Sequence, residues 1–396
     1  PTDLEGLVQL LNTRGRDSLT DTASEELLAA WCEVVERYRD CHSAERQMLD
    51  QALTRLCRLS PTGLQAGLEA VLGGVGRDPA GRLAEEADAW RADHSPAPLV
   101  VMTLASNLPA LAVQAMLPAL LLRCPLILKS PSAEPLFAPA FVGSLVRTLP
   151  ALESALAAIT WKGGDVALES PLFEAADRIL AYGDADTLAD LTDRAGPKVF
   201  SYGPRTSLAV VSSEADPRDI APGLARDIAL FDQRGCLSIQ AVFTDGDASS
   251  LASAIGAELD TLATRWAPGF IDPVAAAGVQ QIRAEATLRG LTSVDLPLAT
   301  GTVVVEPEAR FRPTPGLRSV RIHPLSELES LPEILVDWSG LLQGAALAGE
   351  AAWMLRPKLE SLGLTHFAAP GGLQTPDASW HNGGVHPFTA LTGQPV

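Results

Sequence analysis

The sequence predicts an α/β protein in which a helical N-terminal segment precedes two doubly wound α/β domains. After residue 95, short apolar and β-branched runs alternate with helical stretches, the pattern of βαβ units around a mainly parallel sheet. The length of 396 residues leaves room for two or three domains of roughly 150 residues each. Apolar residues make up 47% of the chain and charged residues 20%, which indicates a folded globular protein.

The first segment, residues 1–95, is predicted to be helical. From Leu4 to about Asp93, apolar residues recur at spacings of three and four, which is typical of amphipathic helices. The clearest stretch contains Leu27, Leu28, Trp31, Val34, Val35 and Tyr38.

The first α/β domain is assigned to residues 96–205, together with part of the C-terminal tail. Its expected strands are 99–105, 125–130, 155–161 and 177–183. Its expected helices lie near 109–122, 134–148, 168–176 and 184–194.

The second α/β domain is assigned to residues 206–370, followed by a Gly- and Pro-rich tail over 371–396. Its expected strands are 206–213, 238–245, 300–307 and 319–325, with helices near 217–230 and 249–266. The run LQGAALAG (342–349) and a helix over 350–361 complete it. Two α/β domains with the working cleft between them is the simplest expected architecture, because pockets favour domain interfaces and the carboxyl ends of parallel strands.

Charge and composition argue against several functions. The chain has 30 basic and 48 acidic residues, 30 − 48 = −18, and no basic run, so neither nucleic acid nor an anionic membrane is an expected partner. The most apolar stretch, 108–128, is interrupted by Pro109, Pro118, Arg123 and Pro125, so no membrane span is assigned. The sequence shows no basic segment followed by an apolar segment of the kind that marks a secretion signal, so we expect a cytoplasmic location.

The cysteines and histidines predict free thiols and no metal site. Five cysteines without a CxxC pair fit reduced thiols better than a disulfide frame or a zinc site. The six histidines show no metal-binding spacing, and no role is assigned to His381 in the tail.

Cys236 is the first candidate for chemistry. In ALFDQRGCLSIQAVF it follows a predicted helix and a glycine and directly precedes a strand, so a sharp loop presents it. A thiol becomes nucleophilic where backbone N–H groups or cations stabilise its thiolate. The alternative is a cysteine that serves only as a small buried apolar residue.

Asn107 and Lys129 are expected at the ends of neighbouring strands. An amide at position 107 could stabilise an oxyanion, although Asn before Pro109 also fits a plain helix cap. A lysine at a carboxyl strand end would face a ligand there, and the alternative is an ordinary exposed lysine.

Two glycine turns at strand ends precede helices. WKGGD contains Gly163 and Gly164, and AYGDADTL contains Gly183. Free N–H groups at such helix starts can receive a phosphate, but neither turn is a GxGxxG or Walker motif, so a simple tight turn is the alternative.

Together, these segments resemble the LuxC-type acyl-CoA reductase family of the aldehyde dehydrogenase superfamily, from about residue 99 to 390. The most specific pieces are FDQRGCLS (231–238), SNLPALAVQAMLPALLLRCPLILKSP (106–131), ITWKGGD (159–165), LQGAALAG (342–349) and LQTPDASWHNGG (373–384). The resemblance implies an aldehyde dehydrogenase-like fold and a nicotinamide cofactor on the first α/β domain. It also implies that Cys236 accepts the acyl group, that Asn107 and the Cys236 N–H form an oxyanion hole, and that Lys129 contacts the cofactor ribose.

Two positions depart from the superfamily pattern. Where hydrolytic aldehyde dehydrogenases carry a glutamate base, this chain has Ser201, so release by hydrolysis is not expected. Where NAD-preferring members often carry a glutamate three residues after the lysine, this chain has Ser132. The missing carboxylate favours NADPH, with NADH as the alternative. The C-terminal residues FTALTGQPV also differ from the basic and aromatic C-terminal residues of many LuxC-type chains.

The expected function is therefore NADPH-dependent reduction of an acyl-CoA or carrier-bound acyl thioester to a fatty aldehyde through a thioacyl-cysteine. Three alternatives are a CoA-acylating aldehyde dehydrogenase working in the oxidative direction, an acyl-phosphate reductase and a catalytically silent binding subunit. By the same resemblance, the chain is expected to form a homo-oligomer.

Overall fold

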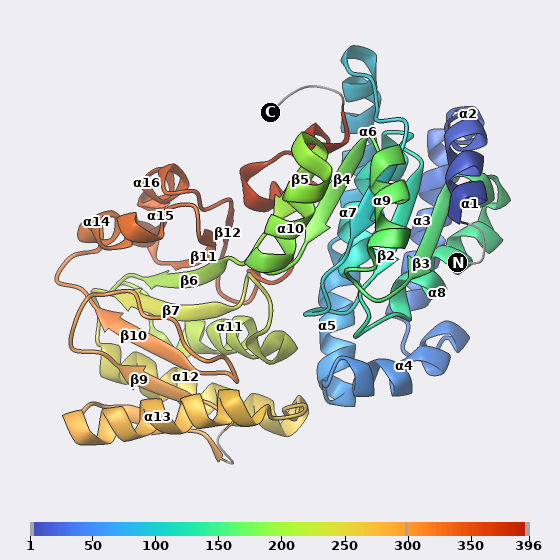
Figure 1. Ribbon diagram of the computed structural model, residues 1–396. Coiled ribbons are helices and arrows are strands. Elements are labelled where there is room, and N and C mark those ends of the chain that lie inside the picture. Colours follow the sequence, from blue (N-terminus) through green and yellow to red (C-terminus); the bar gives the residue numbers. More distant parts are fainter. Residues whose placement is uncertain (1–3, 298–299, 393–396) are drawn as a thin grey trace. The chain divides into compact units, whose positions relative to one another are not determined.

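The computed structural model describes residues 4–297 and 300–392, and the described chain forms two compact units (Figure 1). The first unit comprises the residues up to 57, then 68–204 and those from 377 onward. The second comprises 58–67 and 205–376. The first unit is thus assembled from three separate stretches of chain.

The first unit contains a parallel five-stranded sheet in the order β3-β2-β1-β4-β5. The order reverses at β1, which pairs with both β2 and β4, and ligands of such sheets bind outside the carboxyl ends at this point. The strands are β1 (Val100–Thr103), β2 (Leu126–Ser130), β3 (Leu156–Thr160), β4 (Arg178–Tyr182) and β5 (Val199–Tyr202).

Helices between these strands complete the doubly wound pattern. They are α7 (Leu111–Leu121), α8 (Phe137–Thr148), α9 (Val166–Ala175) and α10 (Ala185–Ala195). Val101, Ile127 and Ile179 of the sheet pack with Leu172 and Phe173 of α9 in one buried cluster. Burial on both faces explains why these strands read as continuous apolar runs.

The N-terminal segment is helical, as predicted. Its helices are α1 (Leu4–Leu10), α2 (Arg16–Asp21), α3 (Ser24–Arg39), α4 (Ala44–Leu56), α5 (Pro61–Gly73) and α6 (Arg77–Asp93). The apolar stripe of α3 packs against α8, where the Phe141 ring lies 5.5 Å from that of Trp31 and 5.0 Å from that of Tyr38. These edge-to-face contacts fix α3 to α8.

The second unit contains a seven-stranded sheet in the order β12-β11-β6-β7-β10-β9-β8. All of its pairs are parallel except β8 with β9. The strands are β6 (Thr206–Val211), β7 (Ile239–Thr244), β8 (Ser293–Asp295), β9 (Thr302–Val305), β10 (Val320–Pro324), β11 (Leu342–Ala348) and β12 (His366–Ala368). Its helices are α11 (Pro217–Ala229), α12 (Ala248–Arg265), α13 (Pro273–Arg289), α14 (Leu331–Leu335), α15 (Glu350–Met354) and α16 (Arg356–Ser361).

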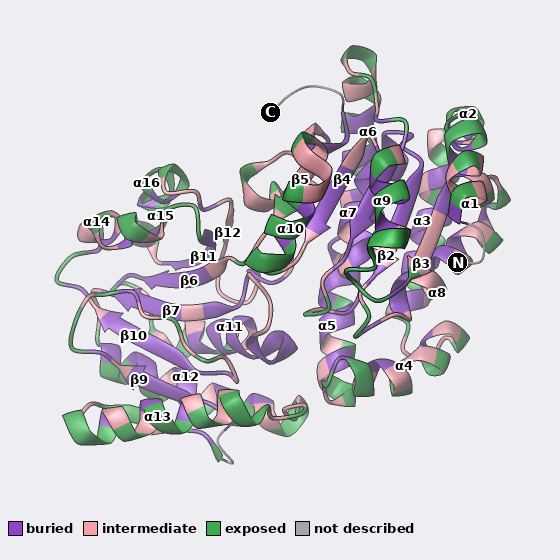
Figure 2. Cartoon of the chain, in the orientation of Figure 1, coloured by how far each residue is buried: buried purple, intermediate pink, exposed green. Residues whose placement is uncertain are grey.

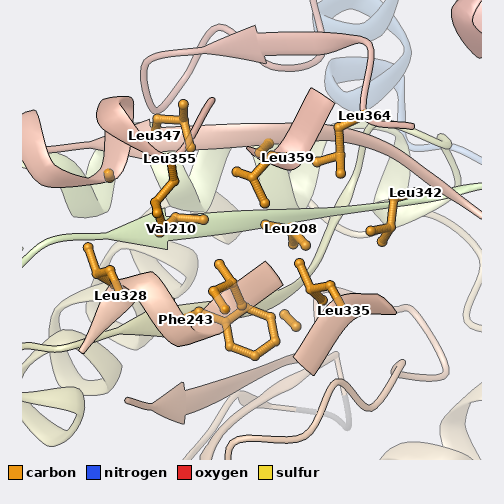
Figure 3. Close-up of a cluster of buried hydrophobic side chains, with 14 of the residues drawn as sticks. Leu208, Val210, Phe243, Leu328, Leu335, Leu342, Leu347, Leu355, Leu359 and Leu364 are labelled. Atoms are coloured by element: carbon orange, nitrogen blue, oxygen red, sulfur yellow. The ribbon is translucent and has the colours of Figure 1, made fainter. Parts of the chain in front are cut away.

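One face of this second sheet carries a leucine-rich core. Leu208, Val210 and Phe243 of the strands share one buried cluster with Leu355 and Leu359 of the 350–361 region and with Leu335 of α14 (Figure 3). In Figure 2 the strands are largely buried, whereas α13 alternates between exposed and partly buried residues.

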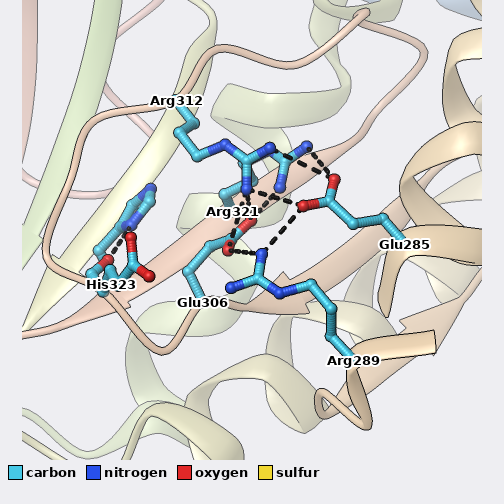
Figure 4. Close-up of polar contacts among 7 residues, drawn as sticks. Glu285, Arg289, Glu306, Arg312, Arg321 and His323 are labelled. Carbon is cyan, nitrogen blue, oxygen red and sulfur yellow. Dashed lines mark hydrogen bonds and ion pairs between the residues drawn. The ribbon is translucent and has the colours of Figure 1, made fainter. Parts of the chain in front are cut away.

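A charged cluster lies where α13 covers the sheet (Figure 4). Glu306, only 2% exposed, pairs with the buried Arg321 and with Arg312 at 3.3 Å. Arg289 pairs with Glu285 at 2.9 Å and with Glu306 at 3.6 Å, which joins the end of α13 to β9 and β10.

The α/β class with two doubly wound sheets is confirmed, and every strand predicted by its range contains an observed strand. β5, β8, β12, α13 and α14 were not predicted. The single helix expected over 350–361 is wrong: α15 and α16 are separate, because Pro357 lacks the N–H that a continuous helix would need. None of the helices in the described ranges is long and apolar enough to cross a membrane.

Candidate active site

Cys236 lies in the loop between the short helix η4 (Leu230–Gln233) and β7. It is half-buried, and its carbonyl oxygen accepts a hydrogen bond from Ser207 Oγ at 2.8 Å. Burial raises the pKa of the thiol to about 11, while the backbone N–H groups of Cys236 and Leu237 and the charge of Arg205 oppose this rise. The thiol is therefore neutral at pH 7 but lies beside N–H groups that would stabilise a thiolate.

The backbone before this loop turns in the left-handed sense. Phe231, Asp232 and Gln233 have φ values of 55°, 51° and 65°, and none of them is glycine or asparagine. Each such residue costs about 1–2 kcal/mol in a left-handed helical conformation. Arg234 N–H closes the turn by donating to the Phe231 carbonyl at 3.2 Å. Strain is thus concentrated directly before the candidate nucleophile.

In the first unit, Lys129 and Gly163 come together at the carboxyl ends of β2 and β3. A Cβ atom on Gly163 would lie 3.5 Å from Lys129 Nζ, so the glycine leaves space beside the ammonium group. Lys129 Nζ also lies 5.9 Å from the centre of the Trp161 ring, within reach of a cation–π contact. Burial lowers the pKa of Lys129, and the charge of Glu169 opposes this shift.

Ser132 lies in the same group of residues. Its hydroxyl donates a hydrogen bond to the Trp161 carbonyl at 3.1 Å. The side chain at this position is therefore neutral, and both it and Lys129 lie against Trp161.

Glu169 on α9 is the member of this group that the sequence analysis missed. Its carboxylate is buried and accepts hydrogen bonds from Trp161 Nε1 at 3.0 Å and from Gly164 N at 3.2 Å. The other oxygen pairs with Arg194 at 2.8 Å. The available signal was an acidic residue inside the otherwise apolar run VALESPLF, directly after WKGGD.

Gly164 and Gly183 both occupy tight turns before helices. Gly164 has a φ of 84°, and Asp165 then caps α9 by accepting from Leu168 N at 3.3 Å. Asp184, directly after Gly183, caps α10 by accepting from Thr187 N at 2.8 Å. Carboxylates already occupy both helix starts, which disfavours a phosphate in the same positions.

Asn107 is exposed in the loop that joins β1 to α7. The alternative role as a helix cap is wrong, because α7 begins at Leu111 and its N-cap is Ala110 in a left-handed conformation with φ 62°. The helix starts later than Pro109 suggested, so Asn107 stays in the loop at the carboxyl end of β1.

Residues 2–394 match the sequence model of the acyl-CoA reductase (LuxC) family. The chain belongs to the LuxC acyl-CoA reductase family.

Two curated relatives are similar to parts of this LuxC-family chain. It is 30% identical over 153 residues to long-chain acyl-protein thioester reductase 2 of Photobacterium leiognathi, an alignment that covers 37% of this chain and 32% of the relative. It is 26% identical over 238 residues to the long-chain acyl-protein thioester reductase of Aliivibrio fischeri, covering 58% of this chain and 50% of the relative. The aligned regions thus span half or less of these relatives.

Solved aldehyde dehydrogenases share the fold. Aldehyde dehydrogenase 21 from Physcomitrella patens, solved with succinate, has a TM-score of 0.70 at 16% identity, covering 96% of this chain and 84% of that one. An aldehyde dehydrogenase from Bacillus cereus, solved with NAD+, has a TM-score of 0.68 at 13% identity, covering 99% and 87%. The predicted aldehyde dehydrogenase-like fold of the LuxC-family chain is confirmed.

Ser201 and His381 can also be placed in this LuxC-family chain. Ser201 is exposed on β5. The His381 ring lies 4.9 Å from that of His386, which stacks on Trp90 of α6 at 4.9 Å and bonds Glu86 through Nε2 at 2.6 Å. His381 therefore belongs to an aromatic cluster that joins the tail to α6. In the parts of the chain that the structure describes, no three His, Cys, Asp or Glu side chains are arranged to hold a metal ion.

Proposed function

We propose that this LuxC-family protein reduces an acyl thioester to an aldehyde through an acyl group carried on Cys236. The observation that carries the proposal is the Cys236 loop, in which a strained turn presents a half-buried thiol beside two backbone N–H groups. The family and the names of the two relatives support acyl thioester chemistry.

In the first step, the sulfur of Cys236 attacks the thioester carbonyl. A bond forms between the Cys236 sulfur and the acyl carbon, the bond to the donor sulfur breaks, and the thiol proton of Cys236 leaves on the donor. Because the Cys236 pKa is about 11, this proton must move as the bond forms. We assign Asn107 and the Cys236 N–H to the oxyanion that develops on the carbonyl.

A nicotinamide dinucleotide, when bound, supplies the hydride that converts the captured acyl group to an aldehyde. The carbon–sulfur bond to Cys236 then breaks, and a proton from solvent restores the thiol. Each turnover thus converts an acyl thioester, NADPH and one proton into aldehyde, free donor thiol and NADP. Ser201 offers no carboxylate base, which supports reduction over hydrolysis as the route of release.

The cofactor is assigned to the first unit and the nucleophile to the second. Lys129 fits the role of a ribose or phosphate contact, since its half-buried ammonium group borders open space at Gly163. Ser132, Gly164 and Gly183 complete the proposed cofactor-binding set, in which the helix starts capped by Asp165 and Asp184 are not phosphate sites. A neutral Ser132 supports NADPH over NADH, because no carboxylate at this position would repel a 2′-phosphate. Assembly into a homo-oligomer stays a prediction from the family resemblance.

The test is the loss of 340 nm absorbance with NADPH or NADH and acyl-CoAs of increasing chain length, with an acyl-carrier-protein thioester in parallel. We expect aldehyde formation by the wild type and none by Cys236→Ala. Mass spectrometry should show an acyl adduct on Cys236 when the cofactor is left out. Cys41→Ala, a second partly buried cysteine, is the matched control and should keep full activity. Equal turnover by Cys236→Ala would refute the proposal.

A further inference from the structure

We infer that Arg318 and Gln233 are positioning residues for Cys236, because they hold the left-handed turn 231–233 from which the Cys236 loop departs. The inference rests on the proposed function, in which the Cys236 sulfur must meet an acyl carbonyl. Neither residue is assigned a contact with reacting atoms, and each acts through the backbone of the turn.

Arg318 fixes the middle of the turn. It is 2% exposed, and its Nε and Nη2 donate to Asp232 Oδ1 at 3.2 and 2.8 Å. The second carboxylate oxygen of Asp232 accepts from Gly269 N at 2.9 Å. Both carboxylate oxygens of Asp232, a residue with left-handed backbone, therefore accept hydrogen bonds from residues far away in the sequence.

Gln233 fixes the end of the turn to both sides of the loop. Its Nε2 donates to the carbonyls of Ile239 at 2.7 Å and Ser319 at 2.6 Å. Its Oε1 accepts from Ser319 N at 2.8 Å. Ile239 is the first residue of β7, so one buried amide joins the strand after Cys236 to the turn before it.

The partner segment is itself left-handed. Leu317 and Arg318 have φ values of 53° and 59°, directly before β10, which is the parallel neighbour of β7. Two strained turns at the starts of adjacent strands thus bond to each other. A strained backbone persists only where its surroundings over-determine it.

Loss of these bonds would let residues 231–233 relax towards right-handed conformations. The loop 234–238 would then leave its position, and the sulfur would move away from the N–H groups of Cys236 and Leu237. We therefore expect Arg318 and Gln233 to set both the rate of acyl capture and the protonation behaviour of the thiol.

The experiment compares Arg318→Met, Arg318→Lys and Gln233→Glu with Arg310→Met, a matched change at an exposed arginine of the same unit. The first readout is single-turnover acylation of Cys236 by an acyl-CoA, followed by mass spectrometry. The second is the pH dependence of iodoacetamide alkylation at Cys236, read from its peptide. Thermal melting identifies any variant that does not fold.

We expect Arg318→Met and Gln233→Glu to slow acylation at least tenfold. The midpoint of alkylation should fall from about 11 towards the ordinary value of 9.0, because a released loop admits water to the thiol. Arg318→Lys should lie in between, and Arg310→Met should stay within twofold of wild type.

An unchanged midpoint in folded Arg318→Met and Gln233→Glu overturns the inference, even if activity falls, because a purely structural role would leave the thiol unaltered. If Arg318→Met does not fold, Gln233→Glu and Arg318→Lys decide the question. If the wild type forms no acyl-enzyme, the proposed function fails, whereas the alkylation midpoint still tests the positioning roles.

Discussion

Glu169 shows how one buried carboxylate organises the proposed cofactor site. It bonds Trp161 and the backbone of Gly164, and it opposes the lowering of the Lys129 pKa. A glutamine at this position would keep an acceptor for the indole but lose the charge that pairs with Arg194. The ammonium group of Lys129 would then lose the anion that favours its charged form.

We therefore expect Glu169→Gln to weaken NADPH binding about tenfold, which corresponds to about 1.4 kcal/mol. Tryptophan fluorescence titration measures this without catalysis, and the KM for the cofactor should rise while kcat changes little. Glu174→Gln, an exposed change on the same helix, is the control. An unchanged dissociation constant in Glu169→Gln would contradict this role.

Which site residues could be predicted depends on where their partners lie in the sequence. Lys129, Ser132 and Gly163 meet because they follow neighbouring parallel strands, and the strand pattern is readable locally. The turn before Cys236 is different, since its conformation depends on Arg318, which is 86 residues away from Asp232. Asp232 alone of the three belongs to a residue type enriched in left-handed backbone, so the residue types do not predict a left-handed turn over Phe231, Asp232 and Gln233.

At the scale of elements, α13 is held by charge as well as by apolar contacts. Glu285 and Arg289 on the helix meet Glu306, Arg312 and Arg321, which lie on or beside β9 and β10 (Figure 4). Glu306 is buried, so its removal would leave Arg321 without its nearest anion. Breaking a buried pair from one side is more damaging than removing both charges.

Glu306→Gln should accordingly lower the free energy of unfolding by about 3 kcal/mol, measured by urea denaturation. The control is Glu285→Gln in the same cluster, whose side chain is 31% exposed and should lose about 1 kcal/mol or less. Equal losses in the two variants would show that burial does not decide the effect.

The elements that were not predicted share weak local patterns. β8 and β12 are three-residue edge strands, too short to show alternation. α13 is rich in alanine, and exposed Val274 and Leu288 blur the contrast between its faces. The interior strands were predictable because both of their faces are buried, which requires continuous apolar runs.

For the molecule as a whole, Asp227 links stability to pH. It is buried on α11, and burial raises the pKa of its carboxyl group from 3.8 to about 6, although Gly371 N donates to it at 2.7 Å. The folded state therefore binds more protons than the unfolded state between about pH 4 and pH 6. The stabilisation from this proton is present below pH 4 and is lost as the pH rises through 6.

Asp227→Asn removes this dependence. The difference in unfolding free energy between this variant and wild type should rise by about 2.4 kcal/mol from pH 4 to pH 7, measured by urea titration at both values. Asp219→Asn, an exposed change on the same helix, should differ from wild type equally at the two pH values. If the difference in unfolding free energy between Asp227→Asn and wild type were also equal at pH 4 and pH 7, the raised pKa assigned to Asp227 would be contradicted.

The residues from 377 onward belong to the first unit, the domain to which part of the C-terminal tail was assigned from the sequence. There, Thr392 accepts hydrogen bonds from Arg178 at 3.2 and 3.0 Å, and the Leu391 carbonyl accepts from Ala97 N at 2.9 Å. On the ribosome, the chain that forms the second unit emerges before these last contacts of the first unit can be made. We therefore expect the first unit to make these contacts only after the second unit has been synthesised, although all five strands of its sheet precede the second unit's strands in the sequence.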